Sequence, residues 1–283
     1  MIYNRTTKSI DEDIQYGGKY LNFLYNSFLG RTILKFIVNP IFSKIYGKYN
    51  DMVISKNKIN KFIKKYEINI NEYEQKEYTS FNDFFIRKKK NTEYDKGKNS
   101  FIAPADSKLL VYKITDDMKI KIKQSVYMLE ELTLDNADLE QFRNGNCLIF
   151  RLSMDDYHRY CYIDDGITEK TKKIKGKLHT VSSISTKHKV YSQNARVCNY
   201  MVTNNFGKII YIEVGALLVG KINNYNKDKY VKGEEKGYFE LGGSTIVILT
   251  SDKVKIDNDI INYSNKGIET KVKYGERIGE LMC

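Results

Sequence analysis

The sequence has few of the residues that cross-link a chain, bind metals or interrupt helices. Its 283 residues include four cysteines, three histidines, two prolines and no tryptophan. The cysteines show no Cys-x-x-Cys spacing in a chain too large to need disulfides, so a reducing compartment is expected. His158 and Cys161 are the only close pair of potential metal ligands, and the lack of a second pair argues against a zinc site.

Long apolar runs are also missing. Arg31, Lys35 and Lys44 interrupt the hydrophobic runs of the first helical region, so none approaches the roughly 18 residues that a membrane-spanning helix needs. The residues from Met1 onward lack an apolar signal core, and we therefore expect a protein that faces the cytosol. Without Gly/Ser-rich tracts a flexible linker is not expected, and 41% hydrophobic residues suffice for a real core in one large domain or two small ones.

Positive charge is in excess. The 47 Lys and Arg against 35 Asp and Glu give a net charge of +12, which favours an anionic partner, either nucleic acid or a membrane surface rich in acidic lipid. Arginine, whose planar fork reads base edges, is scarce beside lysine, and no nucleic-acid-binding motif is present. We therefore expect a membrane surface rather than nucleic acid.

The first hundred residues are predicted to be helical. Apolar residues near one-turn spacing predict a helix over 20–46 that Pro40 interrupts. A second helix, with lysines outside its apolar face, is predicted after Ser55, and Ser80 resembles the N-cap of a short helix over 81–87. Amphipathic helices with basic faces either lie on a membrane or pack on their own domain, and both interpretations stay open.

After about residue 101 the pattern changes to short β-rich runs divided by glycines and polar turns. The whole pattern predicts an α+β protein, with an N-terminal helical, membrane-facing cap over 1–100 on a β-sandwich catalytic domain over 101–283 of the barrel-sandwich hybrid type. A turn and strand over 271–280 closes the chain. The clearest predicted strands lie at 108–114, 147–152, 209–214 and 245–250.

A Gly-Gly-Ser-Thr segment precedes the last of these strands. Paired glycines allow dihedrals that side chains forbid, so the peptide can bend until the Ser244 hydroxyl faces the Gly243 carbonyl. That is the geometry of self-cleavage. On these residues alone, an ordinary turn that enters a strand is the alternative.

Other segments favour self-cleavage. From about Gly18 to the C-terminus the chain resembles the phosphatidylserine decarboxylases, because five motifs occur in the order of that family. They are Phe81-Asn82-Asp83-Phe84-Phe85-Ile86-Arg87, Ala103-Pro104-Ala105-Asp106, Asp156-Tyr157-His158-Arg159, Glu213-Val214-Gly215-Ala216-Leu217-Leu218-Val219-Gly220, and Lys232-Gly233-Glu234-Glu235 through Gly243-Ser244-Thr245.

The resemblance implies a proenzyme that cuts itself between Gly243 and Ser244 into a β chain, 1–243, and an α chain, 244–283. Ser244 would become a covalent pyruvoyl group, the cofactor, which forms a Schiff base with phosphatidylserine and yields phosphatidylethanolamine and carbon dioxide. The implied partners are this lipid and an anionic membrane surface, at the cytoplasmic face of the cell membrane. A homodimer is left open.

The resemblance also assigns roles to single residues. Asp106 would orient and stabilise an imidazolium, and His158, the first histidine of a Tyr-His-Arg-x-His pattern, would act in decarboxylation. The second histidine of that pattern serves self-cleavage in the family, but Cys161 stands there, and a thiol is the weaker base at neutral pH. We therefore predict that His179, which has apolar neighbours, relays protons between Asp106 and Ser244.

The remaining motif residues are predicted to be structural. The segment 213–220 has the pattern of a buried strand and a glycine turn. We expect it to be a fold element first and a wall of the substrate pocket second. Glu234 and Glu235 either shape the turn before the cleavage site or are solvated. His188 stands between two lysines and is expected to be exposed.

Two other function classes fit the same features. One is a non-catalytic basic β-sandwich module that docks to acidic membranes, and the other is a pyruvoyl-dependent decarboxylase of a soluble amino acid. The module would need no cleavage between Gly243 and Ser244, and the soluble-substrate enzyme would need no membrane-facing helices.

Overall fold

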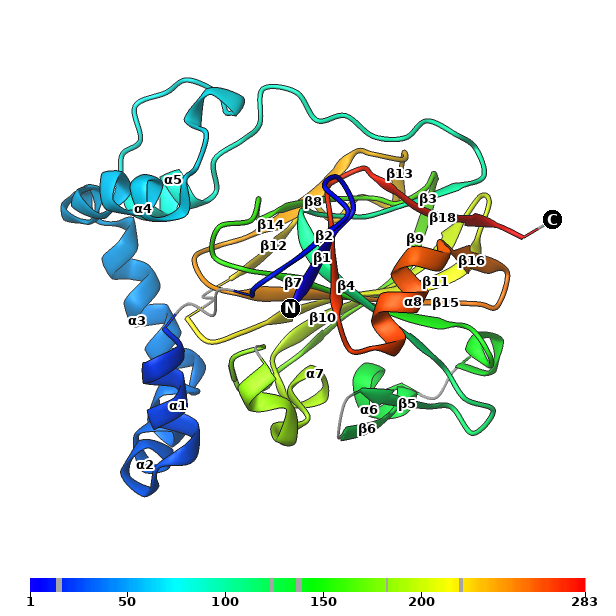
Figure 1. Ribbon diagram of the computed structural model, residues 1–283, viewed down its shortest axis with the longest axis horizontal. Coiled ribbons are helices and arrows are strands. Elements are labelled where there is room, and N and C mark those ends of the chain that lie inside the picture. The colour runs from blue at the N-terminus through cyan, green and yellow to red at the C-terminus, as the bar shows by residue number, and fades with distance from the viewer. Residues whose placement is uncertain (14–16, 123–124, 136–138, 182, 219–220, 283) are drawn as a thin grey trace.

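The computed structural model contains the whole chain and describes all residues except 14–16, 123–124, 136–138, 182, 219–220 and 283. N-terminal helices lie to one side of a large, mostly antiparallel β-sheet region (Figure 1). The predicted α+β class, with helices preceding a β-rich part, is confirmed.

Ten strands of the described chain form the main sheet. Each pairs antiparallel with its neighbour except β1, which is parallel to β17. The four predicted strands correspond to β4, β7, β11 and β15. In spatial order the sheet contains β13 (Lys229–Tyr230), β9 (Gly166–Ile174), β10 (Arg196–Thr203), β11 (Gly207–Gly215), β15 (Ser244–Thr250), β7 (Asn146–Leu152), β4 (Ser107–Lys113), β17 (Glu269–Val272), β1 (Ile2–Asn4) and β2 (Ser9–Asp11).

Strand β15 is central and buried on both faces. Ile246 and Ile248 belong to one core cluster, and Val247 and Leu249 to the cluster on the other side. A continuous apolar, β-branched run suits a strand that is covered on both faces. Ser244 is therefore the first residue of a buried strand, between β11 and β7.

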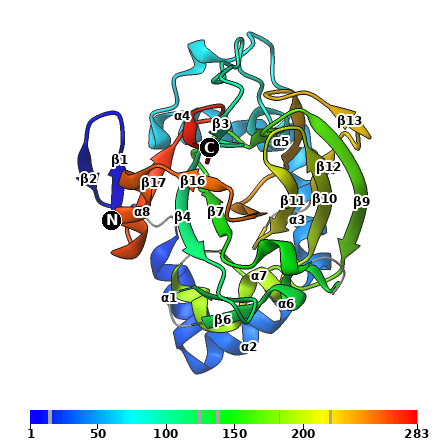
Figure 2. The same ribbon diagram turned by 90° about the vertical axis from the view of Figure 1, so that its right-hand side faces the viewer.

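Smaller sheets and short helices surround the main sheet, which is curved, with β4 and β9 on opposite sides of the view in Figure 2. The sheet of β12, β14 and β8 connects the residues after His158 with the segment that leads to Ser244. The remaining elements of this part are β3 (Ser100–Ile102), β5 (Lys119–Ile122), β6 (Ser125–Met128), α6 (Leu129–Thr133), η3 (Leu139–Phe142), β8 (Arg159–Cys161), η4 (Ser183–His188), α7 (Val190–Gln193), β12 (Ile222–Asn224), β14 (Glu235–Phe239), β16 (Val254–Ile256), α8 (Asn258–Asn265) and β18 (Arg277–Leu281).

Three helices stand where one interrupted helix over 20–46 is predicted: α1 (Gly18–Asn26), α2 (Phe28–Ile37) and α3 (Pro40–Asp51). The predicted interruption at Pro40 is confirmed, and Pro40 also begins α3, because its fixed φ suits the first turn of a helix. The additional break is at Ser27. Its backbone is extended, and its Oγ accepts a hydrogen bond of 2.9 Å from the Gly30 amide, which caps α2.

The next helices pack against Leu241, in the segment that leads to Ser244. The 3₁₀ turns η1 (Val53–Lys58) and η2 (Ile70–Glu72) flank α4 (Ile59–Tyr66), and α5 (Phe81–Phe85) follows. The Ser80 hydroxyl accepts a hydrogen bond of 3.1 Å from the Asp83 amide, so the predicted N-cap is confirmed. Rings from α4 and α5 form an apolar cluster that also contains Leu241.

The first residues of the chain belong to the β-sheet rather than to the helices. Strands β1 and β2 extend the main sheet beyond β17, and Arg5 then binds Asp257, Asp259 and Glu276 at 2.7–2.9 Å. Three-residue strands carry no periodic signal, which is why the sequence pattern does not reveal them.

Candidate active site

Ser244 lies at the point where a turn enters the central strand. It pairs with Gly215 of β11 on one side and with Leu152 of β7 on the other. The residue is fully buried, and its hydroxyl has no hydrogen-bond partner among the described residues. A buried hydroxyl without a partner is uncommon and costs free energy, so this atom calls for a functional explanation.

The backbone before Ser244 depends on glycine. Gly242 has φ = +134°, which side-chain-bearing residues rarely adopt. A methyl group on Gly243 would meet the Leu152 carbonyl oxygen at 3.7 Å and Val181 Cγ2 at 4.0 Å, both ordinary contacts. Conformation therefore requires glycine at 242, whereas packing does not require it at 243.

His158 is the histidine beside this segment. It is buried, its backbone carbonyl accepts a hydrogen bond of 2.9 Å from the Phe239 amide, and its ring lies 4.3 Å from that of Phe85, between centroids. Nδ1 is 2.9 Å from the Asp156 carbonyl oxygen, and Nε2 has no partner among the described residues. Burial lowers the pKa of His158 to about 3, and backbone groups of Asp156 and Gly242 oppose this only in part. The imidazole is therefore neutral at pH 7, with an unprotonated ring nitrogen.

An ion pair lies beside His158. Lys108 Nζ and Asp156 Oδ2 are 2.6 Å apart, and both side chains are buried. The Ser153 amide donates a hydrogen bond of 2.7 Å to the same carboxylate, and burial raises the pKa of Asp156 to about 6 despite the lysine. No local pattern in the sequence reveals this pair, although Asp156 belongs to the Asp156-Tyr157-His158-Arg159 motif.

Asp106 has different partners from those that the resemblance implies. Its carboxylate is 2.7 Å from Lys89 Nζ and accepts a hydrogen bond of 2.8 Å from the Tyr274 amide. Among the described residues, no histidine is hydrogen-bonded to Asp106. The structure thus brings Asp106 to the start of β4, beside β7, but pairs it with a lysine.

Cys161, at the position of the second motif histidine, is fully buried in β8. Burial raises the pKa of its thiol to about 12. The thiol therefore stays protonated at neutral pH.

His179 is buried against the first helix. Its Nδ1 is 3.1 Å from the Tyr25 hydroxyl, and burial lowers its pKa to about 4. Asn194 connects its backbone to the strand partner of Ser244, since the Asn194 side-chain amide donates to the carbonyls of both His179 and Gly215. The ring itself contacts Tyr25 and His188.

The expectation that His188 is exposed is wrong. Its side chain is half-buried, because the ring stacks on His179 at 4.9 Å and meets the edge of Tyr25 at 5.3 Å, between centroids. Packing by α1 covers it, which its neighbouring lysines do not reveal.

The segment 213–220 and Glu235 have structural roles in the part of the chain that is described. The strand of the segment 213–220 is confirmed as the end of β11, and Val219 and Gly220 lie outside the described residues. Glu235 forms an ion pair of 2.6 Å with Arg159, so it is not simply solvated.

Two cavities meet along the Gly242–Gly243 backbone. The first, about 430 Å³, is here named the arm cavity; α1, α2 and α3 line it with apolar side chains, and Gly243 lies in its wall. The second, about 320 Å³, is here named the α4 cavity, and Gly242 lines it. The two share the side chains of Lys65, Tyr66, Met154, Leu217 and Leu218.

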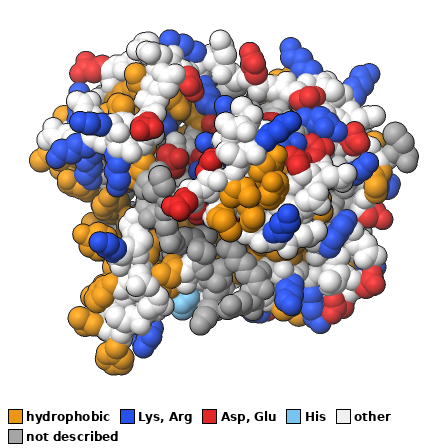
Figure 3. All heavy atoms as spheres, in the orientation of Figure 1, with side chains coloured by type: hydrophobic (Ala, Val, Ile, Leu, Met, Phe, Trp, Pro, Cys, Tyr) orange, Lys and Arg blue, Asp and Glu red, His pale blue; other side chains and the backbone are white. Residues whose placement is uncertain are grey.

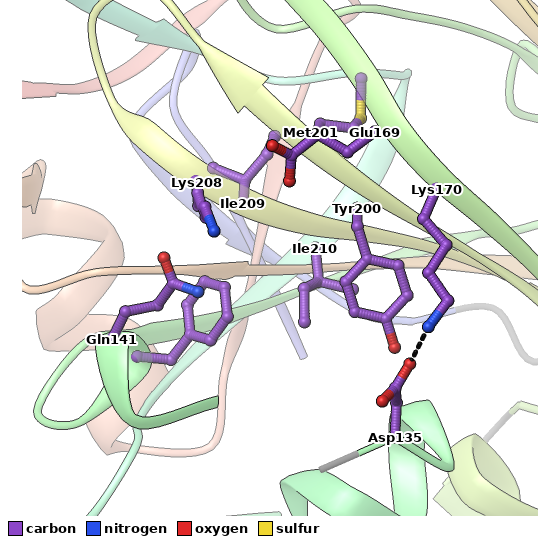
Figure 4. A pocket seen from close by; sticks show the side chains of 10 residues that line it. Asp135, Gln141, Glu169, Lys170, Tyr200, Met201, Lys208, Ile209 and Ile210 are labelled. Carbon is purple, nitrogen blue, oxygen red and sulfur yellow. Dashed lines mark hydrogen bonds and ion pairs between the residues drawn. The ribbon is translucent and has the colours of Figure 1, made fainter. Parts of the chain in front are cut away.

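A further cavity, of about 120 Å³, lies over β9, β10 and β11 (Figure 4). The figure shows Lys170 paired with Asp135 beside Tyr200. None of the predicted site residues lines this cavity, so it is not the reaction site. Within the described part of the chain, no group of three or more His, Cys, Asp or Glu residues is placed to hold a metal ion.

Comparison with known proteins identifies the family. The profile of the phosphatidylserine decarboxylases matches residues 81–280. The chain is 54% identical to phosphatidylserine decarboxylase proenzyme 2 of Clostridium acetobutylicum, over 99% of this chain and 98% of that protein. The chain belongs to the phosphatidylserine decarboxylase family. The proenzymes of Clostridium tetani and of Clostridium botulinum are 44% and 41% identical, each over 98% or more of both chains.

Family membership confirms the main functional prediction. The chain is a carboxy-lyase made as a proenzyme, and members of the family depend on a pyruvoyl group. The non-catalytic module and the soluble-amino-acid enzyme are thereby disfavoured. The buried, unpartnered hydroxyl of Ser244 and the neutral imidazole of His158 fit the formation of such a group.

Proposed function

We propose that the chain decarboxylates phosphatidylserine to phosphatidylethanolamine and that Ser244 is the precursor of its pyruvoyl group. The observation that carries this assignment is the buried, unpartnered hydroxyl of Ser244, two residues after Gly242, whose backbone adjoins the buried imidazole of His158. When formed, the pyruvoyl group supplies a carbonyl that captures the substrate amine and takes up the electrons released with carbon dioxide.

Self-cleavage would begin at Ser244. Its Oγ attacks the Gly243 carbonyl while a base takes the hydroxyl proton, and the C–N bond breaks to give an ester and a free amine on residue 244. Elimination then releases the Gly243 carboxylate and leaves dehydroalanine. Water hydrolyses this residue, ammonia leaves, and the α chain, 244–283, carries the pyruvoyl group.

Two histidines are candidates for the base. His158 Nε2 is neutral, buried and next to Gly242, which favours His158 for self-cleavage as well as for the substrate. The relay through His179 and Asp106 stays a prediction, and it would require both side chains to exchange their partners in the precursor, Tyr25 and Lys89.

The arm cavity is the proposed approach for the lipid. Its wall combines apolar side chains of α1–α3 with Gly243, so an acyl chain lying against the helices would leave the headgroup at the reactive residue. Val181 and Leu152 complete the wall on the side of the sheet.

The N-terminal helices are the proposed membrane-binding surface. Phe28 and Phe36 are 83% and 72% exposed, and Figure 3 shows hydrophobic side chains gathered over α1–α3. Residues 18–50 contain no Asp or Glu, so the same surface is purely cationic and suits acidic lipid. No helix of the described chain is long and apolar enough to span a bilayer. The exposed cations of this surface are Lys19, Arg31, Lys35, Lys44 and Lys48.

The finer architectural predictions belong with this proposal. We place the catalytic domain at 101–283, of the barrel-sandwich hybrid type, and the membrane-facing helical region within 1–100. The protein would then act as a peripheral enzyme at the cytoplasmic face of the cell membrane. The two buried core clusters on opposite faces of the main sheet support a layered catalytic domain.

Intact mass spectrometry of freshly purified protein tests the Ser244 assignment. We expect two polypeptides, 1–243 and 244–283, with the shorter one blocked by a keto acid at its N-terminus. The Ser244→Ala variant should remain one chain. A wild-type protein that is fully active and still continuous at Gly243–Ser244 would refute the assignment.

Vesicle flotation tests the membrane surface. The wild-type protein should float with vesicles that contain acidic lipid and float less with neutral ones, whereas a Phe28→Ser/Phe36→Ser variant should stay at the bottom. Val231→Ser, which removes an exposed apolar side chain from the β-rich part, is the matched control and should float. Equal flotation of all three proteins would contradict this role for α2.

A further inference from the structure

The two cavities that meet at the Gly242–Gly243 backbone differ in chemistry. Apolar side chains of α1–α3 dominate the arm cavity, whereas three lysines of the η1–α4 segment, Lys58, Lys61 and Lys65, line the α4 cavity. Lys65 lines both. The apolar space and the backbone that leads to Ser244 therefore share a cationic edge.

The electrostatic sign of these cavities is uniform. Neither contains an Asp or a Glu among its lining residues, and their charged residues are Arg151 and the three lysines. Arg151 is occupied, because its guanidinium binds Glu269 at 2.8 Å and also Asp13 at 3.0 Å. Such a site favours an anion over a cation or a neutral group.

Two of the lysines are suited to bind that anion. Lys58 donates to the Asn50 side chain at 2.9 Å, lies 4.2 Å from the centre of the Tyr49 ring, and has a pKa that burial lowers. Lys61 and Lys65 are exposed and stand four residues apart on α4, so their side chains share one side of the helix. They can reach the same group at the mouth of the cavities.

We propose that Lys61 and Lys65 bind the phosphodiester of the lipid headgroup and so distinguish a phospholipid from free serine. The inference rests on the proposed function. The substrate joins an acyl chain, a phosphodiester and a serine, and the two adjoining cavities offer apolar side chains, the lysine pair and the Gly242–Gly243 backbone to these three parts. A charge-assisted contact to the phosphodiester would hold the serine amine at residue 244.

Steady-state kinetics with a short-chain phosphatidylserine, kept below its critical micelle concentration, tests the proposal without a membrane surface. For Lys61→Gln and Lys65→Gln we expect KM to rise about tenfold each, the size of one charge-assisted hydrogen bond, with kcat nearly unchanged. Lys61→Arg and Lys65→Arg should keep KM near the wild-type value. Lys64→Gln, on the same helix but in the wall of neither cavity, is the control.

The same samples separate this inference from the proposed function. A fully cleaved Lys61→Gln/Lys65→Gln variant with a wild-type KM for the monomeric lipid overturns the headgroup assignment and leaves Ser244 as pyruvoyl precursor untouched. A KM that rises only on anionic vesicles also overturns it, because the lysines would then bind the bulk membrane surface. A wild-type chain that is active without cleavage refutes the proposed function itself.

Discussion

His158, His179 and His188 have different surroundings although all three carry the same side chain. His158 lies beside the Gly242 backbone and has an unpartnered Nε2, whereas His179 and His188 stack on each other against Tyr25 of α1. Because a general base must reach the proton that it removes, position favours His158.

Paired variants test this assignment. In His158→Ala we expect the precursor to stay whole, because the neutral imidazole nearest the segment is lost, whereas His179→Ala and the control His188→Ala should still cleave. Gel electrophoresis of the purified proteins over time measures the fraction of cut chain. A block in His179→Ala with normal cleavage in His158→Ala would return the proton relay to His179.

The buried imidazole also predicts how stability depends on pH. Burial lowers the pKa of His158 from 6.5 to about 3, so between these values the unfolded chain binds a proton that the folded chain does not. The free energy of unfolding should therefore fall as pH falls from 6.5, by about 1.4 kcal/mol per pH unit for this group. Asp156, with its pKa raised to about 6, acts in the opposite sense below pH 6.

Urea denaturation of the uncleaved Ser244→Ala protein at several pH values measures this slope. Adding His158→Gln removes the titrating group, so the decrease in the free energy of unfolding on acidification should be smaller. An unchanged slope would mean that His158 is protonated in the folded protein.

The two glycines before Ser244 are expected to respond differently to alanine. Gly242→Ala forces a side chain into φ = +134° and should lower the free energy of unfolding by about 1–3 kcal/mol.

Gly243→Ala meets only ordinary contacts and should fold normally. Its methyl group crowds the carbonyl under attack, however, so cleavage should slow by about tenfold or more. Thermal unfolding in the Ser244→Ala background and a cleavage time course measure the two effects. A wild-type rate of cleavage in Gly243→Ala would show that the methyl group does not crowd the carbonyl under attack.

Among the secondary-structure elements, the short helix α5 holds the segment that leads to Ser244. The Asn82 side-chain oxygen accepts a hydrogen bond of 3.2 Å from the Leu241 amide, and its amide group donates at 2.8 Å to Asp51 at the end of α3. The N-cap at Ser80 fixes where α5 begins and therefore where Asn82 points. The motif 81–87, predicted to be structural, thus supports the site through the hydrogen bond between the Asn82 side chain and the Leu241 backbone.

Variants of Asn82 test this support. Asn82→Ala removes both hydrogen bonds, which should cost about 1–3 kcal/mol and slow self-cleavage. Asn82→Asp keeps the acceptor for Leu241 and should cleave faster than Asn82→Ala, although it repels Asp51. Asn69→Ala, which removes the cap of η2, is the control. If Asn82→Ala and Asn82→Asp cleave as fast as the control Asn69→Ala, the contact between Asn82 and Leu241 is dispensable for self-cleavage.

The proposed α chain, residues 244–283, is an integral part of the fold. Residues 244–283 supply β15, β16, α8, β17 and β18, and β15 is buried between β11 and β7. A fragment of this size cannot form a core of its own, so the two chains must stay paired after cleavage.

Size-exclusion chromatography of the cleaved protein tests this pairing. Both chains should elute together at about the 33.1 kDa of the precursor and separate only in denaturant. A mass twice as large would indicate the homodimer that the sequence leaves open. Loss of the short chain in native buffer would contradict the arrangement of β15.

Local patterns predicted the elements that carry a strong repeating signal. The apolar runs at 147–152 and 245–250 form β7 and β15, and Pro40 interrupts the helices where expected. The apolar pattern does not reveal the break at Ser27, because one capping serine is a weak signal inside a helix pattern. Strand β1 was missed because its partner, β17, lies at the other end of the sequence.

The family and the α+β class could be predicted from the chain's residues, because short motifs and apolar periodicity are local patterns. The fold was needed to show that His158 lies beside Gly242, that Lys89 holds Asp106 and that α1 covers His179. These contacts join residues far apart in the chain. Strand order and helix packing bring them together, and no local pattern specifies either.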